Sequence, residues 1–132
     1  MKDKMDTAKK IMLVDDDPNI IDILTIRLKK VGFDVVSCSA GLDVLNKVLS
    51  EQPDLIILDV MLPQLDGYRI CRMLKFDDRY EHIPIIMLTA KAEKKSKEIG
   101  LETGADRYIT KPFDIDQLVK EIEAVLKEKE KA

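Results

Sequence analysis

The sequence is poor in cysteine and histidine. Its two cysteines, Cys38 and Cys71, form no Cys-x-x-Cys pair, which favours two reduced and partly buried thiols over a disulfide or a metal site. The single histidine, His82, lies in a polar stretch with no second histidine or cysteine beside it, and we expect it to be exposed. No apolar run approaches the length of a transmembrane helix, so we expect no membrane partner.

The chain also lacks a strong excess of charge of either sign. Lysine and arginine number 22, aspartate and glutamate number 25, and the formal net charge is -3. A surface that binds nucleic acid directly needs a concentrated positive field, so we do not expect this class of partner. Residues 1–10 are polar and lack the apolar segment of a secretory signal peptide, which predicts a cytoplasmic protein.

What the chain does contain fits one compact domain. Of its 132 residues, 45% are hydrophobic and 36% are charged, a balance typical of a globular protein with a single core. We therefore expect one domain over residues 1–132, with a polar N-terminal extension at residues 1–9 and a polar tail at residues 127–132.

Five short apolar segments have the length and composition of β-strands. Three are continuous apolar runs, as expected of strands that are buried on both faces of a parallel sheet, and two are weaker. The runs are Ile11–Val14, Leu55–Leu58 and Ile85–Leu88, and the weaker segments are Val35-Val36 with Cys38 and Tyr108-Ile109.

A helical pattern follows each of these segments. The first is the clearest, because Asp17 is placed to cap a helix, Pro18 suits the first helical position, and apolar residues recur at helical spacing until Gly32. The other helices are expected around Leu42, Leu45, Val48 and Leu49 with an end at Pro53, from Asp66-Gly67 through Ile70 and Leu74, from about Lys91 to Gly104, and over Ile115, Leu118, Ile122, Val125 and Leu126.

This alternation of strands and helices predicts the fold. Repeated strand and helix units form right-handed crossovers, so we expect an α/β fold of the flavodoxin-like (βα)5 type, with helices on both faces of a five-stranded parallel sheet. The expected strand order is 2-1-3-4-5. In such sheets the carboxyl ends of the strands meet at one edge, and ligands bind there.

Polar and charged residues gather at the expected strand ends. Asp15 and Asp16 follow the first strand, Asp59 ends the third, Thr89 ends the fourth, and Lys111 follows the fifth. Three neighbouring carboxylates repel one another, and one lysine offsets only part of their charge. An oxygen ligand set of this kind suits Mg²⁺, so we expect a magnesium site at this edge.

Four segments of the chain resemble the signature motifs of the receiver domains of response regulators. Each lies at a strand end, the spacing between them is usual for that family, and the resemblance covers nearly the whole chain. The segments are Ile11-Met-Leu-Val-Asp-Asp-Asp-Pro18, Leu58-Asp-Val-Met-Leu-Pro-Gln-Leu-Asp-Gly67, Met87-Leu-Thr-Ala90 and Gly104-Ala-Asp-Arg-Tyr-Ile-Thr-Lys-Pro-Phe113.

The resemblance implies a role for each residue at the strand ends. Asp59 would accept a phosphoryl group, and Mg²⁺ would be held by Asp15, Asp16, Asp59 and the backbone carbonyl of Met61. In the same way Thr89 and Lys111 would bind the phosphoryl oxygens. Thr89 and Tyr108 would be the switch residues: Thr89 would couple the phosphoryl group to the output surface, and the aromatic Tyr108 would follow. An X-Pro bond adopts the cis form more readily than other peptide bonds, so a cis bond at Lys111-Pro112 could aim the lysine inward.

The resemblance also implies partners in two-component signalling. The phosphoryl donor would be a sensor histidine kinase or a histidine phosphotransfer protein, and the surface of the fourth helix, fifth strand and fifth helix would control an output protein or domain. Receivers joined to winged-helix DNA-binding domains typically have an acidic residue at the position of Arg107 and an arginine in the last helix, where this chain has Lys120 and Lys127. These departures argue against the dimer mode of such receivers, and a phosphorylation-dependent dimer stays an open expectation.

Other functions fit the sequence less well, and one alternative context stays open. A dehalogenase-like aspartyl-phosphate phosphatase would need a second aspartate at Met61, and a flavodoxin-like carrier of FMN would place its phosphate against the acidic residues Asp15 to Asp17. The open alternative is the receiver portion of a longer regulator, such as a diguanylate cyclase or a transcription factor. We expect a switch that assists its own phosphorylation and dephosphorylation, without a separate turnover substrate.

Overall fold

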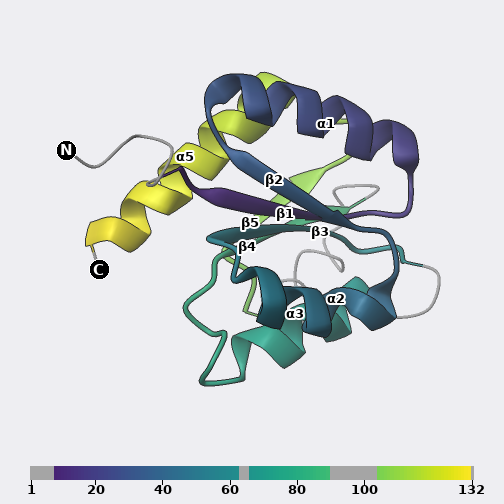
Figure 1. Ribbon diagram of the computed structural model, residues 1–132, viewed down its shortest axis with the longest axis vertical. Helices are drawn as coiled ribbons and strands as arrows, with labels where there is room; N and C mark the ends of the chain where they lie inside the picture. Colours follow the sequence, from purple (N-terminus) through teal and green to yellow (C-terminus); the bar gives the residue numbers. More distant parts are fainter. Residues whose placement is uncertain (1–7, 63–65, 90–103, 132) are drawn as a thin grey trace.

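The structure is a computed structural model and describes residues 8–62, 66–89 and 104–131. Its core is a five-stranded parallel sheet with helices on both faces (Figure 1). The strands are β1 (Lys10–Val14), β2 (Asp34–Cys38), β3 (Leu55–Asp59), β4 (Ile85–Thr89) and β5 (Arg107–Thr110). The helices in the described part of the chain are α1 (Pro18–Val31), α2 (Val44–Glu51) after a 3₁₀ turn at Gly41–Asp43, α3 (Gly67–Lys75) and α5 (Ile115–Lys131).

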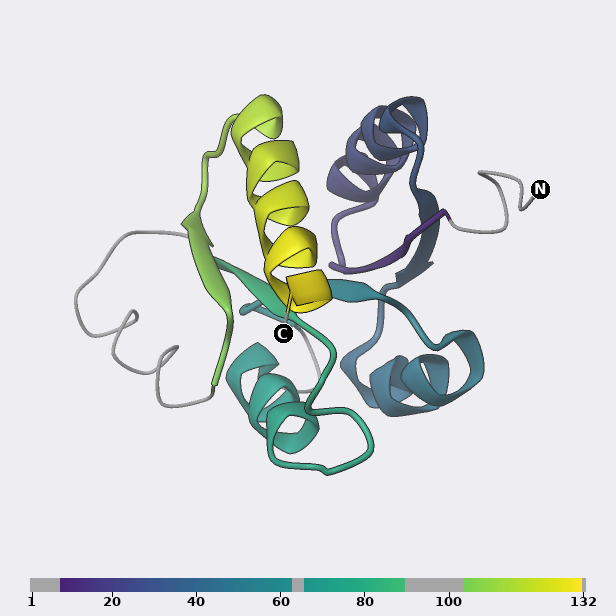
Figure 2. The ribbon, with the colours of Figure 1, turned by 90° about the vertical axis from the view of Figure 1, so that its left-hand side faces the viewer.

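The strand order is β2-β1-β3-β4-β5, which confirms the prediction from the sequence. Helices α1 and α5 cover one face of the sheet and α2 and α3 cover the other, as Figures 1 and 2 show from two directions. The parallel register pairs Val14 with Cys38 and Leu58, and it pairs Asp59 with Leu88. The carboxyl ends of these strands therefore lie at the same edge of the sheet.

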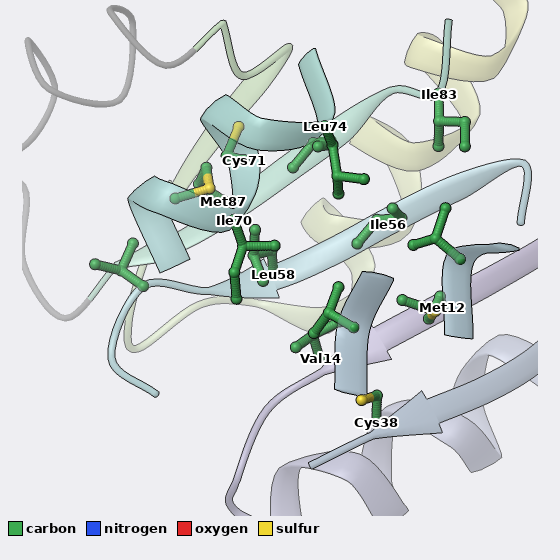
Figure 3. Close-up of a cluster of buried hydrophobic side chains, with 14 residues drawn as sticks. Met12, Val14, Cys38, Ile56, Leu58, Ile70, Cys71, Leu74, Ile83 and Met87 are labelled. Carbon is green, nitrogen blue, oxygen red and sulfur yellow. The ribbon is translucent and has the colours of Figure 1, made fainter. Parts of the chain in front are cut away.

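Two apolar cores lie on opposite faces of the sheet. Successive residues of a strand point to opposite faces, so Ile11 and Leu13 of β1 pack toward α1 and α5, whereas Met12 and Val14 pack toward α2 and α3. The second of these cores is shown in Figure 3. All five residues of β3 and of β4 are buried, as expected of central strands covered on both faces.

Helix α1 begins and ends at the residues predicted from the sequence. The Asp17 side chain accepts a hydrogen bond of 2.9 Å from the Asn19 amide, and Pro18 is the first helical residue. At the other end Gly32 has a φ of 113°, a left-handed conformation that favours glycine, and its amide caps the last turn.

The buried side of the second helix differs from the sequence prediction. Leu42 and Leu49 were expected on its apolar side but are 65% and 59% exposed, whereas Val44 and Val48 are buried. Val44 and Val48 are four residues apart and share the face of α2 that packs on the sheet, whereas Leu49 lies about 100° further round the helix and Leu42 lies before it, in the 3₁₀ turn.

The last helix is longer than expected, and one expected helix cannot be compared. Helix α5 continues to Lys131, so most of the polar tail expected at residues 127–132 is helical, with residues 127–130 exposed. The helix expected from about Lys91 to Gly104 lies almost wholly outside the described residues.

The structure tests the predictions for cysteine and histidine. Cys38 and Cys71 are 5% and 0% exposed, so both thiols are more deeply buried than expected. His82 is exposed, as predicted. Among the helices that the structure describes, none combines the length and the apolar character needed to cross a membrane.

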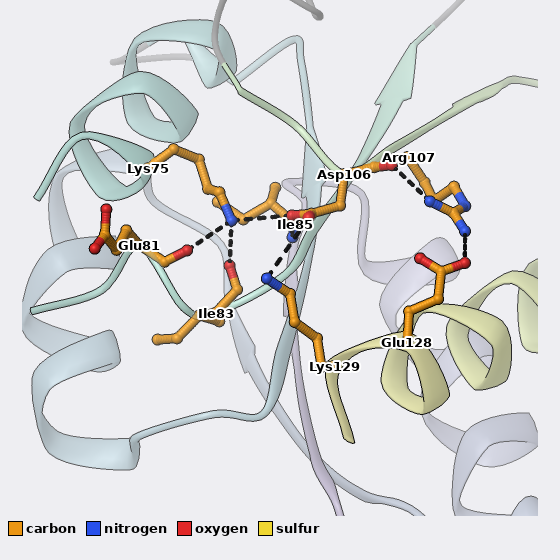
Figure 4. A network of polar contacts seen from close by, with 8 residues as sticks. All are labelled: Lys75, Glu81, Ile83, Ile85, Asp106, Arg107, Glu128 and Lys129. Carbon is orange, nitrogen blue, oxygen red and sulfur yellow. Dashed lines mark hydrogen bonds and ion pairs between the residues drawn. The ribbon is translucent and has the colours of Figure 1, made fainter. Parts of the chain in front are cut away.

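A polar network at the amino ends of the strands joins α3, β5 and α5 (Figure 4). The Lys75 ammonium donates to the carbonyls of Glu81 and Ile83 and to Oδ2 of Asp106, at 2.9, 3.0 and 3.0 Å. The Ile85 amide donates to the same Asp106 oxygen. Next along β5, the Arg107 guanidinium forms ion pairs with two glutamates of α5, Glu121 and Glu128.

Candidate functional site

Three carboxylates meet at the carboxyl edge of the sheet. Asp15 and Asp16 follow β1 directly and Asp59 is the last residue of β3. One oxygen from each carboxylate lies within 4.8 Å of the others. Asp15 and Asp59 are only 3% and 4% exposed, whereas Asp16 is exposed to solvent. The structure thus brings together the acidic residues that the sequence placed at one edge.

Lys111 reaches this cluster from the loop after β5. Its Nζ lies 3.4 Å from Oδ2 of Asp59 and 3.5 Å from Oδ2 of Asp15. The Lys111 amide donates to the carbonyl of Thr89, which holds the loop against the end of β4, and the Lys111-Pro112 bond is cis. One ammonium group therefore faces two buried carboxylates and offsets only part of their charge.

Burial raises the pKa of the Asp59 carboxyl above its ordinary value. The neighbouring Asp15 carboxylate raises this pKa further. The Met61 amide, which donates to Oδ1 at 3.1 Å, and the Lys111 ammonium lower it but do not reverse the direction. The ionised form of Asp59 is therefore the form that additional positive charge would stabilise.

Hydrogen bonds fix the acidic turn after β1. Oδ1 of Asp15 accepts from the Asp17 amide at 2.9 Å, and the Asp15 amide donates to the carbonyl of Cys38 at the end of β2. The Asp17 side chain instead caps α1 and is not part of the metal-compatible group, as the sequence predicted. Of the three consecutive aspartates, Asp15 and Asp16 serve the cluster.

The donor set of the cluster fits a hard divalent cation. Three carboxylates supply oxygen donors close enough to share one ion, and Lys111 compensates too little of their charge. Mg²⁺ is commonly bound by a few protein oxygens and keeps several waters, which suits a cluster with one exposed member. The carbonyl of Met61 stays a predicted ligand.

Thr89 and Tyr108 lie on the two strands beyond β3. Thr89 is 3% exposed at the end of β4, directly after Leu88, the partner of Asp59 in the sheet. Tyr108 lies on β5 opposite Met87, and its hydroxyl is 3.2 Å from the hydroxyl of Tyr68 on α3. Thr89 therefore lies at the carboxyl end of β4, whereas Tyr108 lies nearer the amino end of β5. Their predicted roles remain predictions.

Sequence reasoning missed two residues of α3 that contact this region. A Cβ atom added to Gly67 would lie 2.4 Å from the Asp59 carbonyl oxygen and 2.8 Å from the Val60 Cα. The Gly67 amide donates to the Val60 carbonyl at 3.0 Å, and Tyr68 follows. The Asp66-Gly67 pair was noted only as the start of a helix, although a glycine shortly after the acidic strand end could have suggested close backbone packing.

Residues 11–123 match the sequence profile of the response regulator receiver domain. The chain belongs to this family. A receiver of this family is a component of two-component signalling, so the fold, the acidic edge and the sequence profile agree. The family resemblance seen in the four motifs is confirmed.

Relatives and solved structures extend this assignment. The chain is 45% identical over 122 residues to the alkaline phosphatase synthesis transcriptional regulatory protein PhoP of Bacillus subtilis, covering 92% of the chain and 50% of PhoP. It is 41% identical over 118 residues to the DNA-binding dual master transcriptional regulator RpaA of Synechocystis, covering 89% of the chain and 49% of RpaA. The receiver therefore spans about half the length of these relatives.

A solved structure agrees with the fold. The CheY-like response regulator receiver domain protein from Methanospirillum hungatei superposes with a TM-score of 0.87 at 30% identity. The match covers 94% of this chain and 98% of that protein. The two chains therefore share nearly the whole receiver fold.

Proposed function

We propose that this receiver is a phosphorylation-activated switch in which Asp59 accepts a phosphoryl group in the presence of Mg²⁺. The observation that carries the proposal is the Asp59 carboxylate itself. It is buried, its pKa is raised, and it faces both the Lys111 ammonium and the carboxylates of Asp15 and Asp16. A carboxylate of this kind can attack phosphorus when a metal ion and a cation keep it ionised and offset the charge on the transferring group.

Asp15, Asp16, Asp59 and the carbonyl of Met61 would hold the Mg²⁺ ion. When bound, the ion supplies positive charge that offsets the carboxylates and the oxygens of the transferring group. The two buried carboxylates are held in place by the amides of Asp17 and Met61, so they are oriented before any ligand binds.

The chemistry is a phosphoryl transfer between histidine and aspartate. An oxygen of Asp59 attacks the phosphorus of a phosphohistidine, the P–N bond breaks, and its electron pair stays on the imidazole nitrogen, which then takes a proton. Lys111 and Thr89 would bind the phosphoryl oxygens and so stabilise the charge that is spread over them. Hydrolysis of the resulting acyl phosphate would return the switch to its resting form.

The phosphoryl donor would dock beside Lys111. An apolar groove of about 480 Å³ adjoins this lysine between α1 and the start of α5. Ile23 in this groove is 49% exposed, which leaves apolar surface for a partner helix. A sensor histidine kinase or a phosphotransfer protein is the proposed occupant. The groove is lined by Ile20, Ile23, Leu24, Lys111, Pro112, Phe113 and Ile115.

The output of the switch would be a change on the surface of β5, α5 and the helix expected from about Lys91 to Gly104, which lies almost wholly outside the described residues. The proposed partner is an output protein or an output domain in the same polypeptide, because the relatives PhoP and RpaA are transcriptional regulators of about twice this length. We propose that residues 1–132 form one cytoplasmic receiver domain that acts alone or within such a regulator, with no separate turnover substrate. A phosphorylation-dependent dimer belongs to the same proposal, although Arg107 is already paired with Glu121 and Glu128.

Intact mass spectrometry tests the proposal. Incubation with Mg²⁺ and acetyl phosphate should add one phosphoryl group to the wild-type protein, and Asp59→Asn should remove this labelling. Asp78→Asn is the matched control, because it makes the same substitution at an exposed carboxylate in the loop after α3. Labelling of Asp59→Asn at the wild-type level would overturn the assignment of Asp59.

A further inference from the structure

The first residue of α3 is pressed against the backbone that carries Asp59. Gly67 donates its amide to the Val60 carbonyl at 3.0 Å, and an added Cβ atom would lie only 2.4 Å from the Asp59 carbonyl oxygen. No side chain separates the start of α3 from the end of β3 at this point. A displacement of the Asp59 and Val60 backbone is therefore transmitted directly to the first turn of α3.

Tyr68 extends this contact toward β5. Its amide is fixed by the capping side chain of Asp66, whose Oδ1 accepts from it at 2.8 Å. Its hydroxyl lies 3.2 Å from the hydroxyl of Tyr108, so a side chain of the first turn of α3 contacts the aromatic residue of β5. Both rings are partly buried against the apolar core between the sheet and α3, which limits their movement.

We propose that Tyr68 is a positioning residue that couples the end of β3 to the rotamer of Tyr108. This inference rests on the proposed function and deepens it, because it adds a second route from Asp59 to β5. The predicted route passes through Thr89 on β4, whereas this one passes through Gly67 and Tyr68 on α3. Movement of the β3 end changes the distance between the two hydroxyls and therefore the preference of Tyr108 for the conformation seen here.

The expected size of the effect follows from a single hydrogen bond between neutral groups. Such a bond changes the ratio of two conformations by about five-fold. Tyr68→Phe removes only the hydroxyl and keeps the ring that packs against the core. The population of the Tyr108 conformation seen here should then fall by about five-fold relative to its alternatives.

Fluorine NMR is a direct test because the chain has three tyrosines. Protein labelled with 3-fluorotyrosine should give separate signals for Tyr68, Tyr80 and Tyr108. In Tyr68→Phe the Tyr108 signal should shift, and its change on addition of Mg²⁺ and beryllofluoride should differ from that of the wild type. Tyr80→Phe is the matched control, because Tyr80 packs against the same core but lies in the loop before β4.

A second variant, Tyr108→Phe, keeps the inference testable if Tyr68→Phe does not fold. Tyr108→Phe removes the same hydrogen bond from the other side, so the Tyr68 signal should shift in it. Tyr108 and Tyr68 signals that stay at their wild-type positions in the two variants would overturn the inference.

Phosphoryl labelling separates this inference from the proposed function. Labelling of Asp59 by acetyl phosphate should persist in Tyr68→Phe, since Tyr68 does not contact the carboxylates. If the wild-type protein takes no label, the proposed function and the coupling to Asp59 both fail. If the protein is labelled and the Tyr108 signal is insensitive to Tyr68→Phe, the inference alone fails.

Discussion

At the scale of single residues, Asp59 combines two properties that oppose each other. Its carboxylate must be ionised to act as a nucleophile, but burial raises its pKa because the charged form loses hydration. Its nearest cation, Lys111, is shared with Asp15. The ionised carboxylate of Asp59 is therefore destabilised in the folded protein, and a bound cation would stabilise it.

The raised pKa of Asp59 predicts how stability depends on pH. The folded protein keeps the Asp59 proton to a higher pH than the unfolded chain does. The protonated carboxyl therefore stabilises the folded state below the ordinary carboxyl pKa, and this stabilisation is lost as pH rises through the pKa of the folded state. Asp59→Asn removes the titration. In EDTA, its stability relative to the wild type should therefore increase as pH rises from about 4 toward neutrality.

Urea unfolding at a series of pH values measures this difference. Asp78→Asn controls for the general effect of removing a negative charge from the surface. A stability difference between Asp59→Asn and the wild type that stays constant over this range, or that falls with pH, would contradict the electrostatic account of Asp59.

At the scale of elements, the two edges of the sheet differ in their charge pattern. Opposite charges form ion pairs at the amino ends of the strands, whereas three carboxylates repel one another at the carboxyl ends. The Lys75 ammonium, in a side chain that is 10% exposed, donates to two carbonyls and to Asp106, so its three N–H groups all have acceptors. This contact ties the end of α3 to the segment before β4 and to the start of β5. The Lys75 contacts therefore join three segments at the edge of the sheet opposite the acidic cluster.

Lys75→Met tests how much the Lys75 contacts contribute to the stability of the fold. The variant keeps most of the side-chain length but removes the Lys75 donor from two carbonyls and removes the charged donor from Asp106, which keeps the Ile85 amide. The free energy of unfolding should therefore fall by about 3 kcal/mol. Chemical denaturation measures the loss. Arg79→Met is the matched control, because the Arg79 ion pair with Asp77 has a similar distance of 2.8 Å but an arginine side chain that is 71% exposed.

The control should show no measurable loss of stability, since ion pairs at the surface are screened by water. Equal losses in the two variants would mean that the buried contacts of Lys75 contribute no more than a surface pair.

At the scale of the whole molecule, the cluster links metal binding to folding. Asp15, Asp16 and Asp59 come from strands that are far apart in the sequence and meet only in the assembled sheet. An ion that binds only the folded state stabilises it by mass action, by about 2.7 kcal/mol at ~100 times its dissociation constant. Mg²⁺ should therefore raise the melting temperature of the wild-type protein.

Asp16→Asn should abolish most of this rise. Asp16 is the exposed member of the cluster, so its replacement removes charge from the site without opening the core. It should also make the protein in EDTA at least as stable as the wild type, because one of three repelling carboxylates is lost. Calorimetry with Mg²⁺ and with EDTA compares the variants, and a wild-type Mg²⁺ response in Asp16→Asn would contradict the proposed metal site.

The sequence by itself determined the strands, the ends of several elements and the identity of the acidic residues. These features depend on neighbouring residues: continuous apolar runs indicate buried strands, and Asp17 with Pro18 starts a helix that Gly32 ends. The strand order 2-1-3-4-5 was expected as one of the common orders for right-handed crossovers, and the structure confirms it. The carboxyl ends of such a sheet share one edge, so Asp15, Asp16 and Asp59 could be grouped without coordinates.

Only the tertiary structure decided which side chains meet across elements. Leu42 and Leu49 face solvent because α2 packs its Val44 and Val48 side on the sheet, and apolar residues on both sides of this helix left its buried face open in the sequence. The Tyr68–Tyr108 contact depends on how closely α3 approaches β3, which Gly67 permits. Contacts of this kind depend on packing between segments that are distant in the chain, so local sequence patterns do not predict them.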